Sequence, residues 1–255
     1  MREQILATIV STLQPFEFIL ALQEGGSAAH GQTDRWSDLD VQMVVQDDRI
    51  EETFEVVESA LTKVAPIKWQ CRLPEPTWHG HSQCFYQLEG TSPFLAIDLV
   101  VMKLSNPDRF LEVERHGNLV VHFDKAHLLE PIALDQPQLF AKIAERVTWL
   151  KQMFEFQQML VRKSINRGCW IEGIASYHAW TLQPLIELLN IVYRPNRYDF
   201  RVKYFSRDLP PDIVARVESL YRVADLSQLI EKQQLAEAFF AETLPRAEAI
   251  VDRQS

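Results

Sequence analysis

The stretch from residue 25 to residue 41 constrains the fold more than any other part of the chain. It reads GGSAAHGQTDRWSDLDV and lies between two short apolar runs, residues 16–22 and 41–45. Short apolar runs bounded by polar loops are typical of buried strands. We therefore expect a strand, a polar loop and a second strand. Because side chains alternate along a strand, Asp38 and Asp40 should share one face, about 6–7 Å apart.

Two carboxylates at this spacing repel each other unless a cation lies between them. Hard divalent cations prefer oxygen ligands, and Mg²⁺ is usually bound together with substrate phosphates. Gly26 would let backbone N–H groups approach a phosphate closely, and the hydroxyl of Ser27 would add a donor. A metal pair beside a phosphate-binding turn indicates phosphoryl or nucleotidyl transfer.

A further acid, Asp98, is the single charged residue in the apolar run 94–101. The pattern Gly26-Ser27, then a gap of about ten residues, then Asp38-Leu39-Asp40-Val41 resembles the signature of the polymerase-β-like nucleotidyltransferase superfamily. That family needs a third carboxylate on a later strand, and Asp98 supplies one. The resemblance implies that Asp38, Asp40 and Asp98 bind two Mg²⁺ ions as the catalytic and metal site.

The same resemblance implies that Gly26 and Ser27 bind the phosphates of a nucleoside triphosphate, with ATP favoured. An acceptor hydroxyl would attack the α-phosphorus and pyrophosphate would leave. Asp98 is then the nearest carboxylate candidate to accept the hydroxyl proton.

Length and composition are those of a globular protein. The 255 residues suffice for one large domain or two moderate ones. No apolar run is long enough to cross a bilayer, and the first fifteen residues lack the features of a signal peptide. The three cysteines, Cys71, Cys84 and Cys169, are widely spaced and form no Cys-x-x-Cys motif. We therefore expect neither a disulfide framework nor a zinc site, and a reducing cytoplasm fits best.

The net charge of −9 is unevenly distributed. Residues 1–134 carry 20 acids and 10 Lys or Arg, whereas residues 135–255 carry 15 acids and 16 Lys or Arg. Nucleic-acid-binding proteins need a basic surface, so we expect no nucleic-acid partner and no membrane partner. An acidic first half would suit a cationic acceptor.

Hydrophobic periodicity predicts a mixed sheet in the first half. The expected elements, in order, are helix 3–13, strands 16–22 and 41–45, helix 49–64, and strands 67–73, 85–88, 95–101 and 119–123. This order matches a nucleotidyltransferase core and predicts a domain over residues 1–130. The loop 74–82 contains His79 and His81, which have no third metal ligand nearby, so we interpret them as solvated loop residues.

Helical spacing dominates the second half. Helices are predicted over 139–161, 170–193, 210–221 and 227–250, with short connections typical of an up-down bundle over residues 135–255. The fold class is therefore α+β. A mixed core followed by a helical bundle resembles the aminoglycoside and lincosamide nucleotidyltransferases, which bind nucleotide and antibiotic between two such domains. This implies a small-molecule hydroxyl acceptor, with antibiotics among the candidates.

Several features of the second half have two interpretations. The cations Arg162, Lys163 and Arg167 could reach a triphosphate, but they also suit a helix C-terminus. The basic and aromatic segment 193–207 could bind phosphate or border an acceptor pocket, but such segments are more often connectors. Glu145 and Glu172 could act as general bases, yet each is more simply a surface acid. A homodimer is left open.

Two rival functions also fit the sequence. A non-catalytic nucleotide-binding or antitoxin-like partner protein could use the same fold, although such proteins are typically single small domains. A nucleotidyltransferase directed at RNA or at protein is the second rival. The acidic first half disfavours RNA, whereas a protein hydroxyl acceptor stays open.

Overall fold

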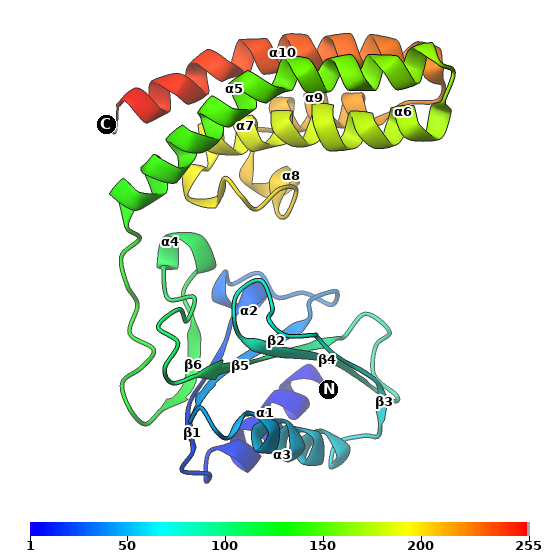
Figure 1. The fold of residues 1–255 in the computed structure, drawn as a ribbon. Helices are drawn as coiled ribbons and strands as arrows, with labels where there is room; N and C mark the ends of the chain where they lie inside the picture. Colours follow the sequence, from blue (N-terminus) through cyan, green and yellow to red (C-terminus); the bar gives the residue numbers. More distant parts are fainter. Residues whose placement is uncertain (254–255) are drawn as a thin grey trace. The chain divides into compact units, whose positions relative to one another are not determined.

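The chain consists of two compact units. A computed structural model describes residues 1–253, and the chain divides into residues 1–134 and a second unit that begins at Asp135. Within the described residues, the strands belong to the first unit and the second unit is helical (Figure 1). The predicted α+β class, a mixed sheet followed by a helical region, is confirmed.

The first unit is built on a six-stranded mixed sheet. Its strands have the order β3-β4-β5-β2-β1-β6, and β2 pairs with β5 in parallel whereas the other pairs are antiparallel. The strands are β1 (Ile19–Glu24), β2 (Leu39–Val45), β3 (Ile67–Arg72), β4 (Ser82–Leu88), β5 (Ile97–Lys103) and β6 (Val120–Asp124). The parallel pair is thus formed by strands that are distant in the sequence.

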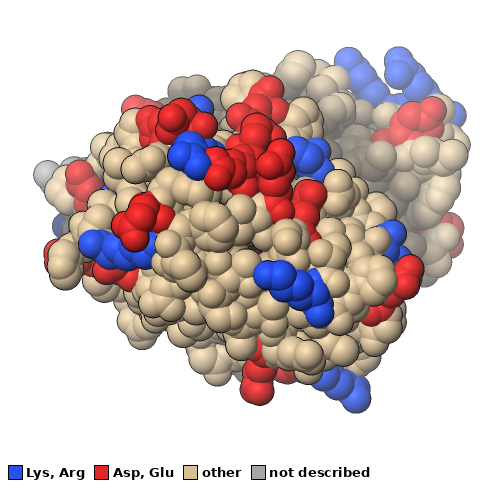
Figure 2. Space-filling view, turned by 90° about the horizontal axis from the view of Figure 1, so that it is seen from below, with Lys and Arg blue, Asp and Glu red and all other residues tan. Residues whose placement is uncertain are grey.

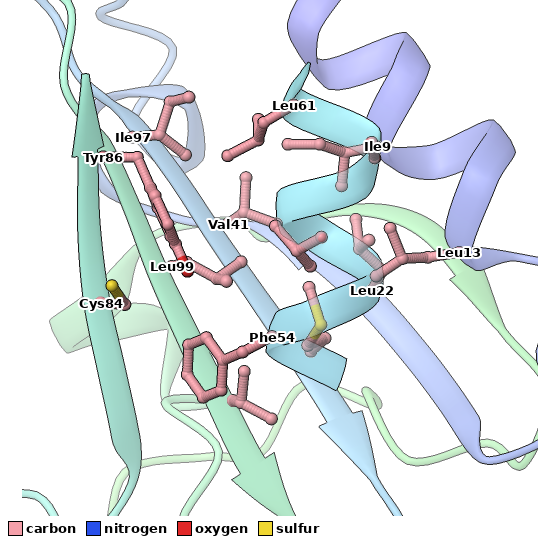
Figure 3. Packing of buried hydrophobic residues seen from close by; sticks show 14 of the residues in the cluster. Ile9, Leu13, Leu22, Val41, Phe54, Leu61, Cys84, Tyr86, Ile97 and Leu99 are labelled. Atoms are coloured by element: carbon pink, nitrogen blue, oxygen red, sulfur yellow. The ribbon is translucent and has the colours of Figure 1, made fainter. Parts of the chain in front are cut away.

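Two helices, α1 (Arg2–Leu13) and α3 (Ile50–Thr62), cover one face of this sheet (Figure 1). Side chains alternate along β2, and its apolar residues Leu39, Val41 and Met43 are fully buried in the core under these helices. Figure 3 shows residues of α1, α3 and the strands meeting in this core, among them Ile9, Leu13, Leu22, Phe54, Leu61, Tyr86 and Leu99. The intervening residues of β2 face the other side.

The predicted order of long elements in this unit is confirmed, and several boundaries differ by a few residues. The first strand begins at Ile19, not at Phe16, because turns occupy the residues after Pro15. The strand predicted over 85–88 begins at Ser82, because Ser82–Tyr86 pair with β5 and residues from Cys84 pair with β3. Two one-turn helices, α2 (Gly26–Ala29) and α4 (Val113–His116), lack the length to give a periodic signal.

The second unit is a set of packed helices. Helix α10 packs against α5 and α7, and α5 packs against α6. The elements are α5 (Gln136–Asn166), α6 (Trp170–Tyr177), the π-helical turn η1 (His178–Leu182), α7 (Gln183–Tyr193), the 3₁₀ turn η2 (Pro195–Arg197), α8 (Phe205–Asp208), α9 (Pro211–Tyr221) and α10 (Leu226–Asp252). The four predicted long helices are present, and α5 begins earlier than predicted because the Asp135 side chain caps it by accepting from the Gln138 N–H.

A π-helical turn interrupts the helix predicted over residues 170–193. The backbone there forms wider turns between α6 and α7, so the carbonyl of Trp180 accepts from the Gln158 side chain at 2.8 Å. The buried hydroxyl of Thr181 in turn donates to Oε1 of Gln158. These bonds satisfy polar groups within the helical core.

The sheet core provides a test of the fold. We expect Val101→Ala, at a fully buried position of β5, to lower the free energy of unfolding by about 2 kcal/mol, because it removes two methyl groups and leaves a cavity. Native-state hydrogen exchange of the β2 and β5 amides measures this loss. Val121→Ala in β6, where the side chain is 45% exposed, is the matched control and should cost far less. Equal losses in the two variants would contradict the described packing.

Candidate active site

The parallel pairing of β2 with β5 brings two of the predicted acids side by side. Asp40 is the register partner of Asp98, and its neighbour Leu39 is the partner of Ile97. Adjacent strands lie about 4.8 Å apart, so the two carboxylates project from neighbouring positions. Both acids are half-buried, and they alternate with fully buried core residues such as Val41. They therefore lie on the face opposite α1 and α3.

Asp38 lies at the same end of these strands, just before β2. Its side chain is exposed, and its Oδ1 accepts a hydrogen bond of 3.3 Å from the backbone N–H of Ala96, two residues before Asp98. Nε of Arg2 donates to the Asp38 carbonyl at 3.4 Å, and the same guanidinium forms an ion pair of 2.6 Å with the buried Glu24. The position of Asp38 is thus fixed by α1 and by the segment that leads into β5.

The glycine-serine turn contacts the acids directly. Gly26 has φ +56°, and a Cβ atom built on it would lie only 1.9 Å from Oδ2 of Asp40. The preceding N–H, of Gly25, donates to the carbonyl of Asp40 at 3.1 Å. Glycine suits position 26 for two reasons: L side chains rarely adopt this backbone conformation, and a Cβ atom would force the Asp40 carboxylate to move.

Ser27 lies at the start of the one-turn helix α2. Its Oγ is enclosed and makes no hydrogen bond to any described residue. A buried hydroxyl normally has a partner. A phosphate oxygen would be a chemically suitable acceptor for this hydroxyl, and the phosphate-binding role of Ser27 stays a prediction.

The chemistry of the acids suits a hard cation, because carboxylate oxygens are the ligands that Mg²⁺ prefers. Asp40 and Asp98 would be the residues to hold it. Within residues 1–253, however, no group of three or more His, Cys, Asp or Glu side chains is arranged to hold a metal ion. The site of three carboxylates and two Mg²⁺ ions stays a prediction.

Gln83 on β4 forms a hydrogen bond with Asp98, and the sequence analysis does not predict this contact. Nε2 of Gln83 donates to Oδ1 of Asp98 at 2.6 Å, and Oε1 of Gln83 lies 3.0 Å from Nε2 of His79. Gln83 is only 8% exposed. The only sequence signal was a polar residue in a strand that was predicted to begin two residues later.

The interpretation of His81 as a solvated loop residue is wrong. His81 is 2% exposed, and its ring stacks on His79 and contacts Phe110 edge-on. Burial lowers the pKa of His81, and the neighbouring His79 lowers it further. Nδ1 of His81 lies 3.3 Å from Nδ2 of Asn106. His81 is therefore buried among the rings of His79 and Phe110, although it lies in the loop before β4.

Cations and acids in the second unit behave mainly as surface residues. Arg162 lies 3.6 Å from Glu237 on α10 and donates to the Gln158 carbonyl of its own helix. Glu145 and Glu172, the two candidate general bases, are exposed. Arg162, Glu145 and Glu172 thus have the contacts and exposure of surface residues, and these observations assign no catalytic role to them.

The basic and aromatic segment after α7 is organised by a buried guanidinium. Arg194 is 8% exposed and donates to the carbonyls of Arg201 and Lys203, to Oδ1 of Asn190 and to Oδ2 of Asp208. Such a saturated set of acceptors is typical of a structural arginine. Arg194 therefore holds the segment in shape.

A cavity of about 510 Å³ opens within the second unit. It is lined by two arginines, Arg146 and Arg201, and by two acids, Glu187 and Asp199, together with the aromatic rings of Trp149 and Tyr198. Arg146 forms a bidentate ion pair with Glu187. The formal charges of these two arginines and two acids sum to zero.

The face of the molecule drawn in Figure 2 carries no basic stripe. Acidic groups gather in the upper part of this view, and basic side chains are scattered over the face. Helix α3 contributes four acids to the surface of the first unit, Glu51, Glu52, Glu55 and Glu58. In residues 1–253, no helix combines the length and the apolar character needed to span a bilayer.

Comparison with known proteins reveals similarity only at the level of three-dimensional structure. No protein-family model and no curated protein matches the chain. An aminoglycoside 6-adenyltransferase from Bacillus subtilis matches 98% of this chain and 90% of its own, with a TM-score of 0.40 and 11% identity. A nucleotidyltransferase-like protein from Exiguobacterium sibiricum matches 100% and 78%, with a TM-score of 0.42 and 13% identity.

A spectinomycin adenyltransferase from Enterococcus faecialis, solved with ATP and spectinomycin, matches 99% of this chain and 98% of its own. Its TM-score is 0.35 and its identity is 11%. All three structures are named as adenyltransferases or as nucleotidyltransferase-like, the class that the sequence motif resembles. At these low scores and identities the likeness carries no residue-level correspondence.

The contact between Gly26 and Asp40 can be tested by comparing two glycines of one loop. We expect Gly26→Ala to lower the melting temperature and to shift the backbone amide resonances around Asp40, because the new Cβ would collide with the carboxylate. Gly31→Ala is the matched control, since Gly31 has a similar φ of +63° but no heavy atom lies within 4 Å of its built Cβ. It should show only the strain of a left-handed residue, about 1–2 kcal/mol. Similar spectra around Asp40 in both variants would refute the contact.

Proposed function

We propose that the protein is a Mg²⁺-dependent nucleotidyltransferase that moves a nucleoside monophosphate from a nucleoside triphosphate to a hydroxyl group of a small molecule. The observation that supports this best is the convergence of three sequence-distant segments. The acids Asp40 and Asp98 are register partners on adjacent parallel strands, and Gly26 lies against Asp40. ATP is the favoured nucleotide.

Each residue has a role in this proposal. Asp40 and Asp98 would hold the metal, and Asp38 would join them from the end of β2. When bound, Mg²⁺ would offset the charge of the phosphates and favour deprotonation of the acceptor hydroxyl. Gly26 keeps the turn close to the carboxylates, and the enclosed hydroxyl of Ser27 would donate to a phosphate oxygen.

The reaction transfers the α-phosphoryl group in line. The acceptor oxygen forms a bond to the α-phosphorus while the bond to the bridging oxygen of pyrophosphate breaks. The hydroxyl proton passes to a carboxylate, for which Asp98 is the candidate. Oδ1 of Asp98 is fixed by the Gln83 amide at 2.6 Å, which holds the carboxylate in one orientation during this transfer.

The acceptor is proposed only as a class. The deficit of positive charge in residues 1–134 would attract a cationic small molecule, and aminoglycoside and lincosamide antibiotics belong among the candidates. A hydroxyl of a protein is the alternative acceptor.

Replacement of the paired acids tests the proposal. We expect Asp40→Asn and Asp98→Asn to lower metal-dependent pyrophosphate release by about 100-fold or more, because metal stabilisation of the transition state contributes several kcal/mol. Both variants should remain folded, since each removes one of two neighbouring like charges. A thermal-shift screen of nucleoside triphosphates with Mg²⁺ selects the nucleotide, and pyrophosphate release is then measured across a panel of antibiotics and simple polyols.

Asp48→Asn is the matched control, because Asp48 is an exposed acid in the turn after β2. It should leave pyrophosphate release unchanged, and chelation of the metal with EDTA should abolish release in the unmodified protein. Incubation with α-labelled ATP distinguishes labelling of the chain itself from labelling of a small acceptor. Near-normal turnover of the Asp40→Asn variant with a responsive acceptor would overturn the assignment.

A further inference from the structure

A chain of hydrogen bonds leads from the loop before β4 to the candidate catalytic acid. It runs from the backbone N–H of His81 to Nδ1 of His79 (3.1 Å), from Nε2 of His79 to Oε1 of Gln83 (3.0 Å), and from Nε2 of Gln83 to Oδ1 of Asp98 (2.6 Å). The chain thus connects the loop 74–82 to an acid on β5.

The first hydrogen bond determines which ring nitrogen of His79 is the acceptor. A backbone N–H can only donate, so Nδ1 of His79 must accept from His81. The hydroxyl of Thr77 lies 3.2 Å from the same Nδ1, but its proton is directed to the carbonyl of His81 at 2.5 Å. Nδ1 is therefore the acceptor, which leaves Nε2 as the nitrogen that donates toward Gln83.

The second link fixes the side-chain amide of Gln83. Because Nε2 of His79 is a donor, the atom facing it must be the amide oxygen of Gln83, and the amide nitrogen must then face Asp98. This orientation makes the 2.6 Å contact a donated hydrogen bond to a carboxylate. Since Gln83 is only 8% exposed, water competes little for these groups.

The loop is itself held rigid around His79. His79 stacks on the buried His81, with ring centroids 5.2 Å apart, and contacts Phe110 edge-on at 5.9 Å. A ring locked by a backbone donor and by two aromatic neighbours has little freedom to turn. The amide that it orients is therefore preorganised.

We infer that His79 is a positioning residue for nucleotidyl transfer, which acts through Gln83 to hold the carboxylate of Asp98 in its reactive orientation. The inference rests on the proposed function, because it assigns Asp98 to the reaction. His79 itself touches neither metal nor substrate in this role. The amide of Gln83 is a neutral donor, so it orients the carboxylate without itself adding a positive charge.

Kinetics of variants at His79 and Gln83 test the coupling. We expect His79→Phe, which keeps a ring but removes the donor, to lower kcat about tenfold with KM for the nucleotide nearly unchanged, as is typical for residues behind a metal ligand. His79→Gln, which retains an N–H donor, should recover most of the loss. Because His79 acts through Gln83, adding His79→Phe to Gln83→Leu should cause no further loss. His127→Phe, at an exposed histidine after β6, is the control.

A spectroscopic measurement tests the chain without turnover. Long-range ¹H–¹⁵N correlations should show the His79 proton on Nε2, and the Gln83 side-chain amide should move toward the position of an unbonded amide in Asp98→Ala. In His79→Phe that amide should become heterogeneous, whereas in His79→Gln it should stay single.

The outcomes separate the two proposals. A proton on Nδ1 of His79, unchanged kcat in His79→Phe, or an additive loss in the double variant, each in an active protein, overturns this inference alone. An unmodified protein that releases no pyrophosphate with any acceptor overturns the proposed function and, with it, the role of His79, even where the Nε2–H form is seen. A tenfold loss of kcat in His79→Phe, together with near-normal kcat in His79→Gln, supports both the proposed function and the role of His79.

Discussion

The register between β2 and β5 is the constraint on which the site depends. Leu39 pairs with Ile97 and Val41 pairs with Leu99, and all four side chains are essentially fully buried in one core. A slip of one residue would turn every side chain of one strand to the other face and bury its acid among apolar groups. The burial of the apolar residues therefore places Asp40 beside its partner on β5, and the site follows from the packing of the core.

The glycine-serine turn shows how the structure changes the meaning of a sequence motif. The sequence suggested that Gly26 gives a phosphate access to the backbone. The structure adds a steric requirement, because the glycine faces Oδ2 of Asp40 with no room for a Cβ atom. Since the N–H of Gly25 also bonds to the carbonyl of Asp40, the turn and the acid form one local unit. A phosphate bound at this turn would therefore lie next to the carboxylate.

Local patterns predicted much of the first unit, and long-range pairing explains what they missed. Apolar runs correctly indicated a strand directly after Asp40, which in the structure begins at Leu39, and another strand that contains Asp98. Their adjacency depends on β5 pairing with β2 across more than fifty residues, and no local periodicity encodes this choice. The sequence does not mark His81 as buried, because the loop 74–82 has no repeating pattern of apolar and polar residues. Gln83 was missed for a related reason, since its strand begins only where β4 meets β5 at Ser82.

Acids on this unit are held in two chemically different ways, and the difference bears on their function. Glu24 is 3% exposed and forms an ion pair with Arg2, so its charge is offset within the fold. Asp98 instead receives a neutral amide N–H from Gln83, and Asp38 receives a backbone N–H from Ala96. A neutral donor fixes the orientation of a carboxylate and leaves its negative charge in place. Glu24 therefore joins α1 to the sheet, whereas uncharged N–H donors help to set the orientations of Asp38 and Asp98.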